Sequence, residues 1–553
     1  MGKRIRQIKH FYYYPLSFFQ RIRLKRLGNH SYSWINCNNI MHMERLPSKS
    51  FSYNSSTARR SFEKYFCKYY EHHSKEIIIN YIKKLVYLDY VDYHFFRESI
   101  KIQLKGENYI IVNDNAMFNG IYNNKIPQNK NISIFILLYR LLIMVIKSIS
   151  HLIITIRTKN KVKSKPIIFL RKKPYSDLGL FSILKKYIKK NNQDCIGLIY
   201  RFNKEGFYNE FIYLNKITGV AFLIIKATMQ TIFTVIIYYK DIFRKVPNMY
   251  FTRIVNDIYL SNIIVSLPSK IITGVLVDRP IYQLLYKFKF SYQKIISLNE
   301  SFWYLPIESF DYNYFDIYYH LNEHDKKTIN INGGKINEHI KVPFYRKDLI
   351  IPSNGISKDL NELINKYSKT TIIAPIQVPE DQCLPWARVE LNSFILASIV
   401  LAEKNPDNIF IIKGKKGELN FLDKKTNFLI SKTKNIHTIF SIKPRLLKYN
   451  QFEDIITKAD LLISMSHMST TIWQAISSNV PAIAINDIHP PSFLNEYSNF
   501  EIKLDELSEA YDYWINLSSQ EWSILRDEIM ENVNIKDANG LEFIASDLCD
   551  RLN

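Results

Sequence analysis

Short hydrophobic runs alternate with longer stretches of helical spacing from about residue 370 to the end of the chain. The runs at residues 371–375, 408–412, 461–465 and 482–485 have the length of buried strands, and residues 391–404 have the spacing of a helix. Alternation of this kind predicts a parallel sheet with helices on both faces, whose ligands lie beyond the carboxyl ends of the strands.

The preceding part of the chain shows the same alternation more weakly. We expect a helix at residues 177–190 and strands at residues 166–170, 195–200, 263–266, 273–277 and 294–300. Two further strands are expected, one that carries Asp316 and one that leads into residues 340–346. Residues 347–369 are polar, with Pro352 and Gly355, as is typical of a linker. The pattern therefore predicts a first α/β lobe over residues 165–346 and a second over 370–553.

Two longer apolar segments interrupt the first half of the chain, at residues 132–156 and 217–239. The first contains Arg140 and Lys147, seven residues apart and hence on one side of a helix, and the second contains Lys226. An amphipathic helix lying in a membrane interface fits this pattern better than a membrane span. Burial against a globular core is the alternative for both segments.

A polar cluster follows the run at residues 461–465 and precedes a helical pattern. Hydroxyls and an imidazole are concentrated in it, at Ser466, His467, Ser469, Thr470 and Thr471. Such groups lie beside free backbone N–H groups at the positive end of a helix dipole, where phosphate binds well. The alternative is that Ser469 or Thr470 only caps the helix, and that His467 is structural.

Further polar side chains fall at or just after the other predicted strand ends of the second lobe. Because parallel strands end at one edge of a sheet, we expect these residues to converge with the cluster on one crevice. They are Gln377, Glu380, Arg388, Lys413, Lys415, Lys416 and Glu418.

The amino-acid composition indicates which classes of partner the chain attracts. The 75 basic and 51 acidic residues give a formal charge of +24, which attracts nucleotide sugars, anionic lipids or nucleic acid. Joint enrichment in Ile, Lys, Asn, Tyr and Phe is also what an AT-rich genome would give. Five widely spaced cysteines have neither zinc nor redox spacing and favour a reducing compartment. The basic, aromatic N-terminal residues 1–164 are expected to form an extension that docks on the first lobe or on a membrane.

Three motifs in the second lobe resemble the C-terminal halves of bacterial surface-polysaccharide glycosyltransferases with the two-lobed GT-B fold. They are P-x-Q-x-P-E from Pro375, K-G-K-K-G-E from Lys413, and I-S-M-S-H-M-S-T-T-I-W-Q-A-I-S-S-N-V-P-A-I from Ile463. The chain departs from the family at Gln474, where Glu is common, and at Asn479, where Gly is common. Asn is the next best residue for a left-handed helix cap.

The resemblance implies an α/β fold of two Rossmann-like lobes with a central donor and acceptor crevice. The first lobe would bind the acceptor and the second a nucleotide sugar. The donor-binding residues would be those of the crevice and the cluster, together with Gln474. Charge on the leaving phosphate can be stabilised by lysines, hydroxyls and amides without a metal, and no D-x-D pair stands where metal-dependent transferases have theirs. We therefore expect neither a metal nor another cofactor.

An inverting transfer needs a base for the acceptor hydroxyl, which is usually a carboxylate of the first lobe. Glu300, at a predicted strand end, is the leading candidate, followed by Asp316 and Asp278.

The function implied is transfer of a sugar to a lipid-linked or oligosaccharide acceptor in capsule or lipopolysaccharide synthesis, at the cytoplasmic face of the bacterial inner membrane. No nucleic-acid partner is expected for such an enzyme. A nucleotide-sugar 2-epimerase, a polyol-phosphate transferase, and a non-catalytic protein that binds membrane or RNA are the alternatives.

Overall fold

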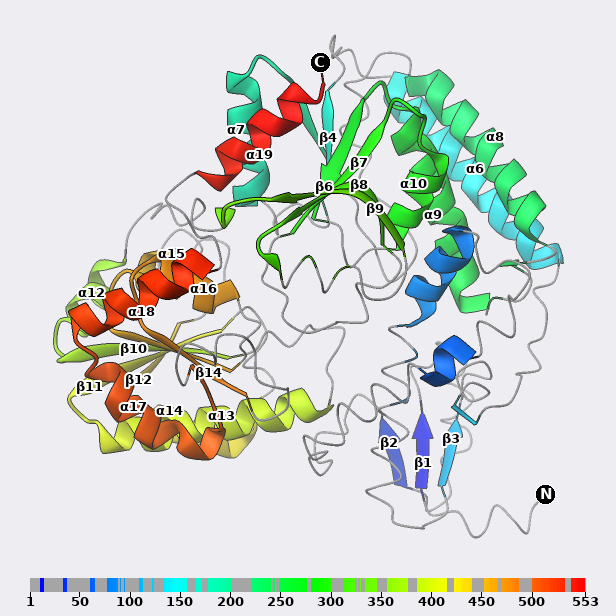
Figure 1. Ribbon diagram of the computed structural model, residues 1–553. Helices are drawn as coiled ribbons and strands as arrows, with labels where there is room; N and C mark the ends of the chain where they lie inside the picture. Colours follow the sequence, from blue (N-terminus) through cyan, green and yellow to red (C-terminus); the bar gives the residue numbers. More distant parts are fainter. Residues whose placement is uncertain are drawn as a thin grey trace, which may run out of the picture. The chain divides into compact units, whose positions relative to one another are not determined.

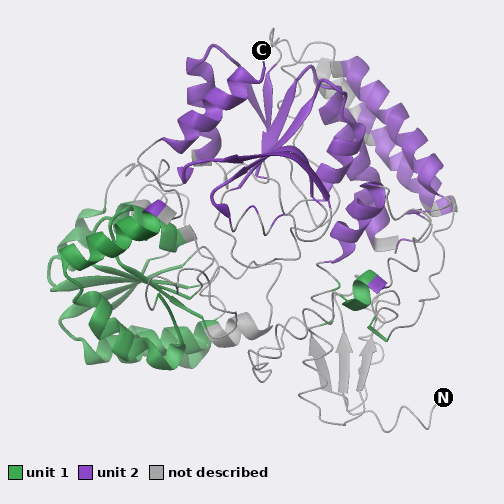
Figure 2. Cartoon of the chain, in the orientation of Figure 1, with its two compact units in different colours: residues 1–63, 90–127, 350–530 green, residues 64–89, 128–349, 531–553 purple. Residues whose placement is uncertain are grey.

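The computed structural model divides into two compact units, each assembled from separate parts of the chain (Figures 1 and 2). Unit 1 contains residues 1–63, 90–127 and 350–530, and unit 2 contains residues 64–89, 128–349 and 531–553. The residues that the structure describes are 10–13, 33–36, 60–64, 77–87, 90, 94, 109–112, 122–123, 134–156, 166–171, 178–199, 220–239, 242–243, 246, 248–275, 280–299, 313–323, 326, 329, 334–345, 356–375, 385–414, 422–439, 452–465, 470–486, 500–532 and 539–552.

Unit 1 is built on a six-stranded parallel sheet with the order β12-β11-β10-β13-β14-β15. Taken along the chain, this order is 3-2-1-4-5-6, that of a doubly wound dinucleotide-binding sheet. Its strands are short and rich in Ile, and their middle residues are buried because helices cover both faces. The strands are β10 (Lys369–Ala374), β11 (Asn408–Lys413), β12 (Ile436–Ile439), β13 (Leu461–Ser464), β14 (Ala482–Ile485) and β15 (Glu501–Ile502).

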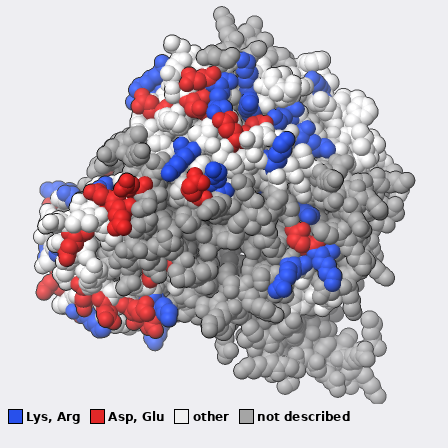
Figure 3. Space-filling view, viewed as in Figure 1, with Lys and Arg blue, Asp and Glu red and all other residues white. Residues whose placement is uncertain are grey.

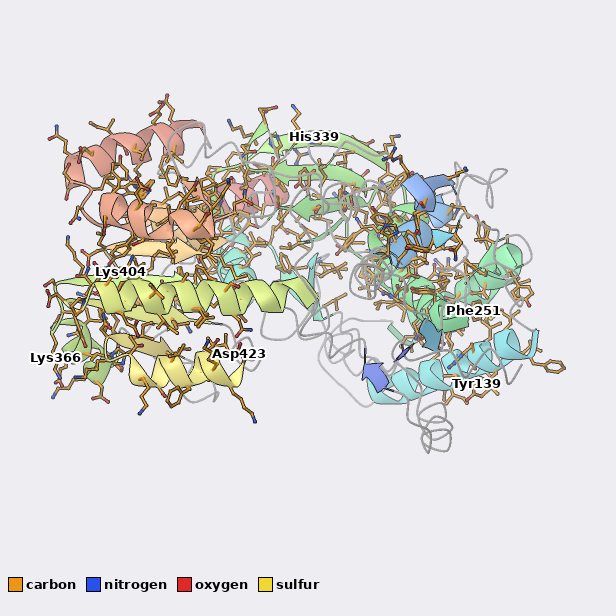
Figure 4. All side chains as sticks on the ribbon, turned by 90° about the horizontal axis from the view of Figure 1, so that it is seen from below. Tyr139, Phe251, His339, Lys366, Lys404 and Asp423 are labelled. Atoms are coloured by element: carbon orange, nitrogen blue, oxygen red, sulfur yellow. The ribbon has the colours of Figure 1, made fainter. Side chains whose placement is uncertain are left out.

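Helices connect these strands, and several have a side chain that caps the first turn. In α14, for example, Asp423 Oδ1 accepts a hydrogen bond from the Thr426 N–H at 2.6 Å (Figure 4). The helices are α12 (Lys358–Ile364), α13 (Pro385–Lys404), α14 (Lys424–Lys432), α15 (Phe452–Ile456), α16 (Thr470–Ser477), η10 (Leu504–Glu506), α17 (Leu507–Ile515) and α18 (Ser519–Asn532). A separate parallel sheet, β2-β1-β3, is formed by β1 (His10–Tyr13), β2 (Ser33–Asn36) and β3 (Tyr109–Val112).

Unit 2 contains a second six-stranded parallel sheet, with the order β5-β4-β6-β7-β8-β9. Along the chain this order is 2-1-3-4-5-6, another doubly wound arrangement. The strands are β4 (Ile167–Arg171), β5 (Cys195–Ile199), β6 (Ile271–Gly274), β7 (Lys294–Leu298), β8 (Asn313–His320) and β9 (Gly334–Lys341). The two sheets confirm the expectation of two α/β lobes with parallel strands.

The helices of unit 2 come from three distant parts of the chain. Besides α7 (Leu178–Lys190), α9 (Asn248–Ser266) and α10 (Ile281–Phe288), they include α6 (Ile134–Ile156), α8 (Val220–Tyr239) and the C-terminal α19 (Gly540–Asp550). Helix α19 packs on α7. The helical residues 77–87 also join this unit, where Lys84 Nζ donates to Asn313 Oδ1 at 2.7 Å and Tyr81 donates to Asp257 at 2.9 Å.

The predicted strand at residues 263–266 is wrong, because these residues end helix α9. Ile263, Ile264 and Val265 are almost fully buried, as is most of α9. A helix that is buried on most sides lacks the polar face by which its period could be recognised, and its apolar end then resembles a short strand.

Three segments differ from the domain boundaries expected from the sequence. Residues 531–553, expected in the second lobe, belong to unit 2, where Leu541, Ile544 and Leu548 of α19 are buried. Helix α6, expected in an N-terminal extension, also belongs to unit 2. Helix α12 occupies part of the expected linker at 347–369.

Candidate functional site

The strand order of unit 1 reverses between β10 and β13. Ala374, the last residue of β10, is the register partner of Ser464, the last residue of β13. The Met465 N–H donates to the Ala374 carbonyl at 3.0 Å, one residue beyond the end of β13. In open α/β sheets the crevice at such a reversal, outside the carboxyl ends, is where ligands bind.

Helix α16 begins at Thr470, five residues after Met465. The polar cluster predicted from the sequence therefore lies between the end of β13 and the first turn of α16. The first backbone N–H groups of a helix have no partner within it, and they carry the positive end of the helix dipole. This position can hold a phosphate group.

Lys413 lies at the same edge of the sheet. It is the last residue of β11, which pairs with β10, and its side chain is partly buried. Thr471 is the second residue of α16, and Gln474 follows one turn later with 5% of its surface exposed. Lys413, Ser464 and the start of α16 therefore lie at the carboxyl edge of one sheet.

The far end of α16 shows why Asn479 can replace glycine. Asn479 has a φ of 63°. Its N–H donates to the Ile476 carbonyl at 3.1 Å, and the Val480 N–H donates to the Ala475 carbonyl at 2.9 Å. These two bonds form a Schellman motif around a left-handed residue, which confirms the predicted cap. The motif turns the chain from α16 directly into β14.

The other predicted donor-binding residues stay predictions. For Arg388 and Thr470 the structure describes only the helical backbone, in α13 and α16 respectively. Gln377, Glu380, Lys415, Lys416, Glu418, Ser466, His467 and Ser469 lie outside the described residues, as do Glu300 and Asp278 of the first lobe.

Asp316 does not fit the role of a catalytic base. Its Oδ1 lies 2.8 Å from Lys289 Nζ and 3.2 Å from Asn337 Nδ2, and its Oδ2 accepts a hydrogen bond from the Ile295 N–H at 2.7 Å. Ile295 is near the start of β7, so the carboxylate lies toward the amino ends of the strands. Ligands bind at the opposite edge, and we therefore assign Asp316 a structural role.

Two histidines near the carboxyl edge of the unit 2 sheet were not singled out from the sequence. His320 ends β8, and its ring centroid is 6.0 Å from that of His339. Figure 4 labels His339, on β9. Burial lowers the pKa of both rings. His320 Nδ1 lies 3.0 Å from the Asn322 carbonyl, which can only accept, so Nδ1 is the donor and Nε2 of the neutral ring is an acceptor. Its position at the end of a strand is the signal in the sequence that indicates it.

Within the described part of the chain, no group of three His, Cys, Asp or Glu side chains is placed to hold a metal ion. The described cysteines, Cys195 and Cys549, are free thiols, and burial raises the pKa of Cys195 to about 12. Such a thiol is inert as a nucleophile.

A scan against models of known protein families finds no match, and a search of curated proteins finds none. Among solved structures, the chain is similar to a UDP-GlcNAc 2-epimerase from Neisseria meningitidis bound to UDP-GlcNAc, with a TM-score of 0.44, 12% identity, and coverage of 70% of this chain and 99% of that chain.

It is also similar to trehalose-phosphate synthases. The UDP-forming enzyme from Burkholderia xenovorans has a TM-score of 0.42 and 10% identity, and that from Burkholderia multivorans has a TM-score of 0.42 and 11% identity. In both comparisons 70% of this chain and 98% of the other chain are covered. At identities and TM-scores this low, the similarities do not identify a family for this chain.

Proposed function

We propose that this chain is a metal-independent glycosyltransferase that takes its sugar from a nucleotide-activated donor. The observation that carries the proposal is the reversal of strand order between β10 and β13, where the hydroxyl-rich segment from Ser464 leads into α16. A donor phosphate at this edge meets backbone N–H groups, hydroxyls and the ammonium group of Lys413. These are the groups that a phosphate-binding crevice needs.

The chemistry follows from where charge develops. As the bond between sugar and phosphate breaks, negative charge grows on the leaving phosphate, and fixed dipoles and a nearby cation stabilise it more strongly in the transition state than in the ground state. Lys413 would supply the cation and the start of α16 the dipoles. Gln474, buried one turn into α16, would hold the helix in place beneath the donor or contact its sugar.

The acceptor half of the reaction needs a proton acceptor. Glu300, directly after the buried Asn299, remains the candidate from sequence. His320 is a second candidate, because its ring is neutral near pH 7 and Nε2 has a free lone pair when Nδ1 donates to Asn322. We propose a lipid-linked or oligosaccharide acceptor of cell-surface polysaccharide synthesis, following the resemblance of the motifs.

The test is thermal stabilisation of the full chain by UDP, CMP, dTDP and GDP and by their sugars. A ligand that binds only the folded state raises the melting temperature, by an amount that grows with the logarithm of its concentration divided by its Kd. We expect one nucleotide to act selectively, and Lys413→Ala and Ser469→Ala each to weaken its binding about tenfold, the loss of one charge-assisted contact.

Lys404→Ala is the matched control. Lys404 ends α13 and donates to Ser508 at 3.1 Å, at the edge of the sheet opposite Lys413, so it loses the same charge without touching the proposed crevice. No stabilisation of a well-folded preparation by any nucleotide would overturn the proposal. Conversion of a bound UDP-sugar to its 2-epimer without an acceptor would replace it with the epimerase alternative.

A further inference from the structure

Helices α6 and α8 of unit 2 each bury one side and expose the other. Leu137 and Met144 of α6, and Ile224 and Val235 of α8, are buried. The two helices pack against each other and against α9 (Figure 1). Their inner sides therefore belong to the core of unit 2.

The outer sides present large apolar side chains in a row at helical spacing. On α6, Phe135, Leu138 and Leu142 are 79%, 56% and 57% exposed, and on α8, Phe222, Phe233 and Ile237 are 69%, 60% and 65% exposed. We call this surface the apolar face. Helices of 23 and 20 residues are about 30 Å long or more. The face is therefore a continuous apolar surface and not a set of isolated exposed side chains.

The charges of the two helices are all of one sign. Neither α6 nor α8 contains Asp or Glu, and the cations are Arg140, Lys147 and Lys226. In Figure 3 the surface in this region is mostly uncharged. Lys226 Nζ lies 5.2 Å from the centroid of the Phe290 ring, which stacks on the exposed Tyr292. A cation beside aromatic rings on an apolar surface is typical of proteins that contact the lipid headgroup layer.

We propose that the apolar face docks in the plane of an anionic lipid bilayer. The face would enter the boundary between headgroups and acyl chains, and the cations of the two helices would contact lipid phosphates. The inference goes beyond the proposed function and does not depend on it, because it rests on helices outside the nucleotide-binding edge.

Docking in the plane, rather than crossing, follows from the contacts of α8. Residues Ala221–Tyr239 are long and apolar enough to cross a membrane, and 22% of an 18-residue stretch within them is buried. However, Asn262 Nδ2 of α9 donates to Thr231 Oγ1 of α8 at 3.1 Å, and both side chains are buried. If α8 crossed the membrane it would separate from α9. The buried Asn262 amide would then lose its acceptor in an apolar core, which is unfavourable.

A second copy of the chain fits the face less well than lipid. Two apposed faces would bring Arg140 and Lys226 of one copy toward the same cations of the other, and neither helix has a carboxylate to pair with them. An anionic bilayer supplies the missing negative charge.

The experiment is flotation of the full chain with vesicles of phosphatidylcholine containing about one third phosphatidylglycerol, compared with pure phosphatidylcholine. We expect co-flotation that is stronger with the anionic vesicles and is released by alkaline carbonate. The variant Leu138→Ser/Leu142→Ser/Phe233→Ser/Ile237→Ser should lower the bound fraction at least about tenfold. Phe428→Ser/Ile524→Ser, at positions 59% and 64% exposed in unit 1, is the matched control and should bind as the original chain does.

Circular dichroism checks that all variants keep their helix content. Resistance of the bound chain to alkaline carbonate would overturn docking in the plane and favour a span. If the original chain does not float, sedimentation velocity tests the other partner. A dimer of the original chain that becomes a monomer in the four-serine variant would overturn docking on lipid and favour a second copy. Equal flotation of the four-serine variant and the original chain would also overturn the proposal.

Discussion

Lys289 and Asp316 form an ion pair at 2.8 Å in which both side chains are largely buried, at 16% and 7% exposure. The Asp316 carboxylate also accepts the Ile295 N–H and the Asn337 amide. It thereby joins the end of α10 to strands β7, β8 and β9. A carboxylate with this many donors holds the sheet together, and its oxygens are committed to structure.

Replacing Asp316 should therefore affect stability more than catalysis. Asp316→Ala would leave a buried ammonium group and two N–H donors without their acceptor, and we expect it to lower the free energy of unfolding by about 3–5 kcal/mol. Asp316→Asn, which keeps an acceptor for Ile295, should lose less. Urea unfolding, monitored by hydrogen exchange in peptides of β7 and β8, measures the loss of stability.

Glu323→Ala is the control for Asp316. Glu323 pairs with Lys326 at 3.5 Å, but these side chains are 59% and 41% exposed, and such a pair contributes less than about 1 kcal/mol. If Asp316→Asn instead kept full stability and lost turnover, Asp316 would be the base that we have excluded.

Glycine at the start of α19 is required by the close approach of this helix to residues 343–345. A Cβ on Gly540 would lie 2.6 Å from the Pro343 carbonyl oxygen and 2.9 Å from Tyr345 Cβ. We expect Gly540→Ala to lower the free energy of unfolding of unit 2 by about 1–3 kcal/mol, because backbone must move. Hydrogen exchange should increase in α19 and in α7, on which it packs.

The control on α19 is the exposed Ser546. Ser546→Ala adds no contact and should change stability by no more than about 0.5 kcal/mol. Arg551→Ala removes hydrogen bonds of 2.8 and 3.0 Å to Glu338 and one of 2.6 Å to Asp547. It should cost about 1 kcal/mol, since these pairs are partly solvent-exposed. A stable Gly540→Ala variant with unchanged exchange in α7 would contradict the tight packing of α19.

The left-handed conformation of Asn479 predicts that glycine is tolerated better than alanine at this position. Asn479→Gly should keep or slightly raise stability, whereas Asn479→Ala should lower it by about 1 kcal/mol, because a Cβ without a local hydrogen-bonding group is disfavoured at a φ of 63°. Tryptophan fluorescence during urea unfolding reports mainly unit 1, which contains five of the six tryptophans, among them the buried Trp473 and Trp514.

Asn192 offers a matched comparison. It has a φ of 56° after α7 in unit 2, so Asn192→Ala should have a similar cost that appears in hydrogen exchange of α7 instead. Equal stability of the glycine and alanine variants at position 479 would contradict the prediction. It would show that the left-handed conformation at this position does not contribute to the free energy of unfolding of unit 1.

The six-stranded sheet of unit 1 could largely be predicted from the sequence because its signals are local. The apolar run at residues 482–485 predicts β14 at its observed residues, and the residue type of Asn479 predicts its cap conformation. Each rests on a hydrophobic period or on backbone preference within a few residues.

What could not be predicted depends on contacts distant in the chain. The docking of α19 on α7 joins residues more than three hundred positions apart, through pairs such as Asn539 and Tyr187. The role of Asp316 depends on Lys289 and Asn337, which no motif connects to it. The polar cluster from Ser466 to Ser469 lies outside the described residues, so its role in the site stays a prediction.

The histidine pair of unit 2 predicts a loss of stability in mild acid. Burial lowers the pKa of His320 and of His339 below the ordinary value of 6.5. Lys326 adds to the lowering of both pKa values and His339 to that of His320, while Glu323 opposes both shifts and the hydrogen bond to Asn322 opposes that of His320. As the pH falls through about 6.5, the unfolded chain takes up protons that the folded chain does not. The free energy of unfolding should therefore fall from pH 7 toward pH 5, by at most about 1.4 kcal/mol per pH unit for each proton.

Urea unfolding between pH 5 and 8, read by pulsed hydrogen exchange at a fixed labelling pH in peptides of β8 and β9, measures this dependence. The variant His320→Asn/His339→Gln should flatten it in unit 2. His437→Gln is the matched control, because burial also lowers the pKa of His437, but in unit 1. A slope in unit 2 that survives the double variant would mean that other groups take up the protons, and that the pair plays no part in the acid response.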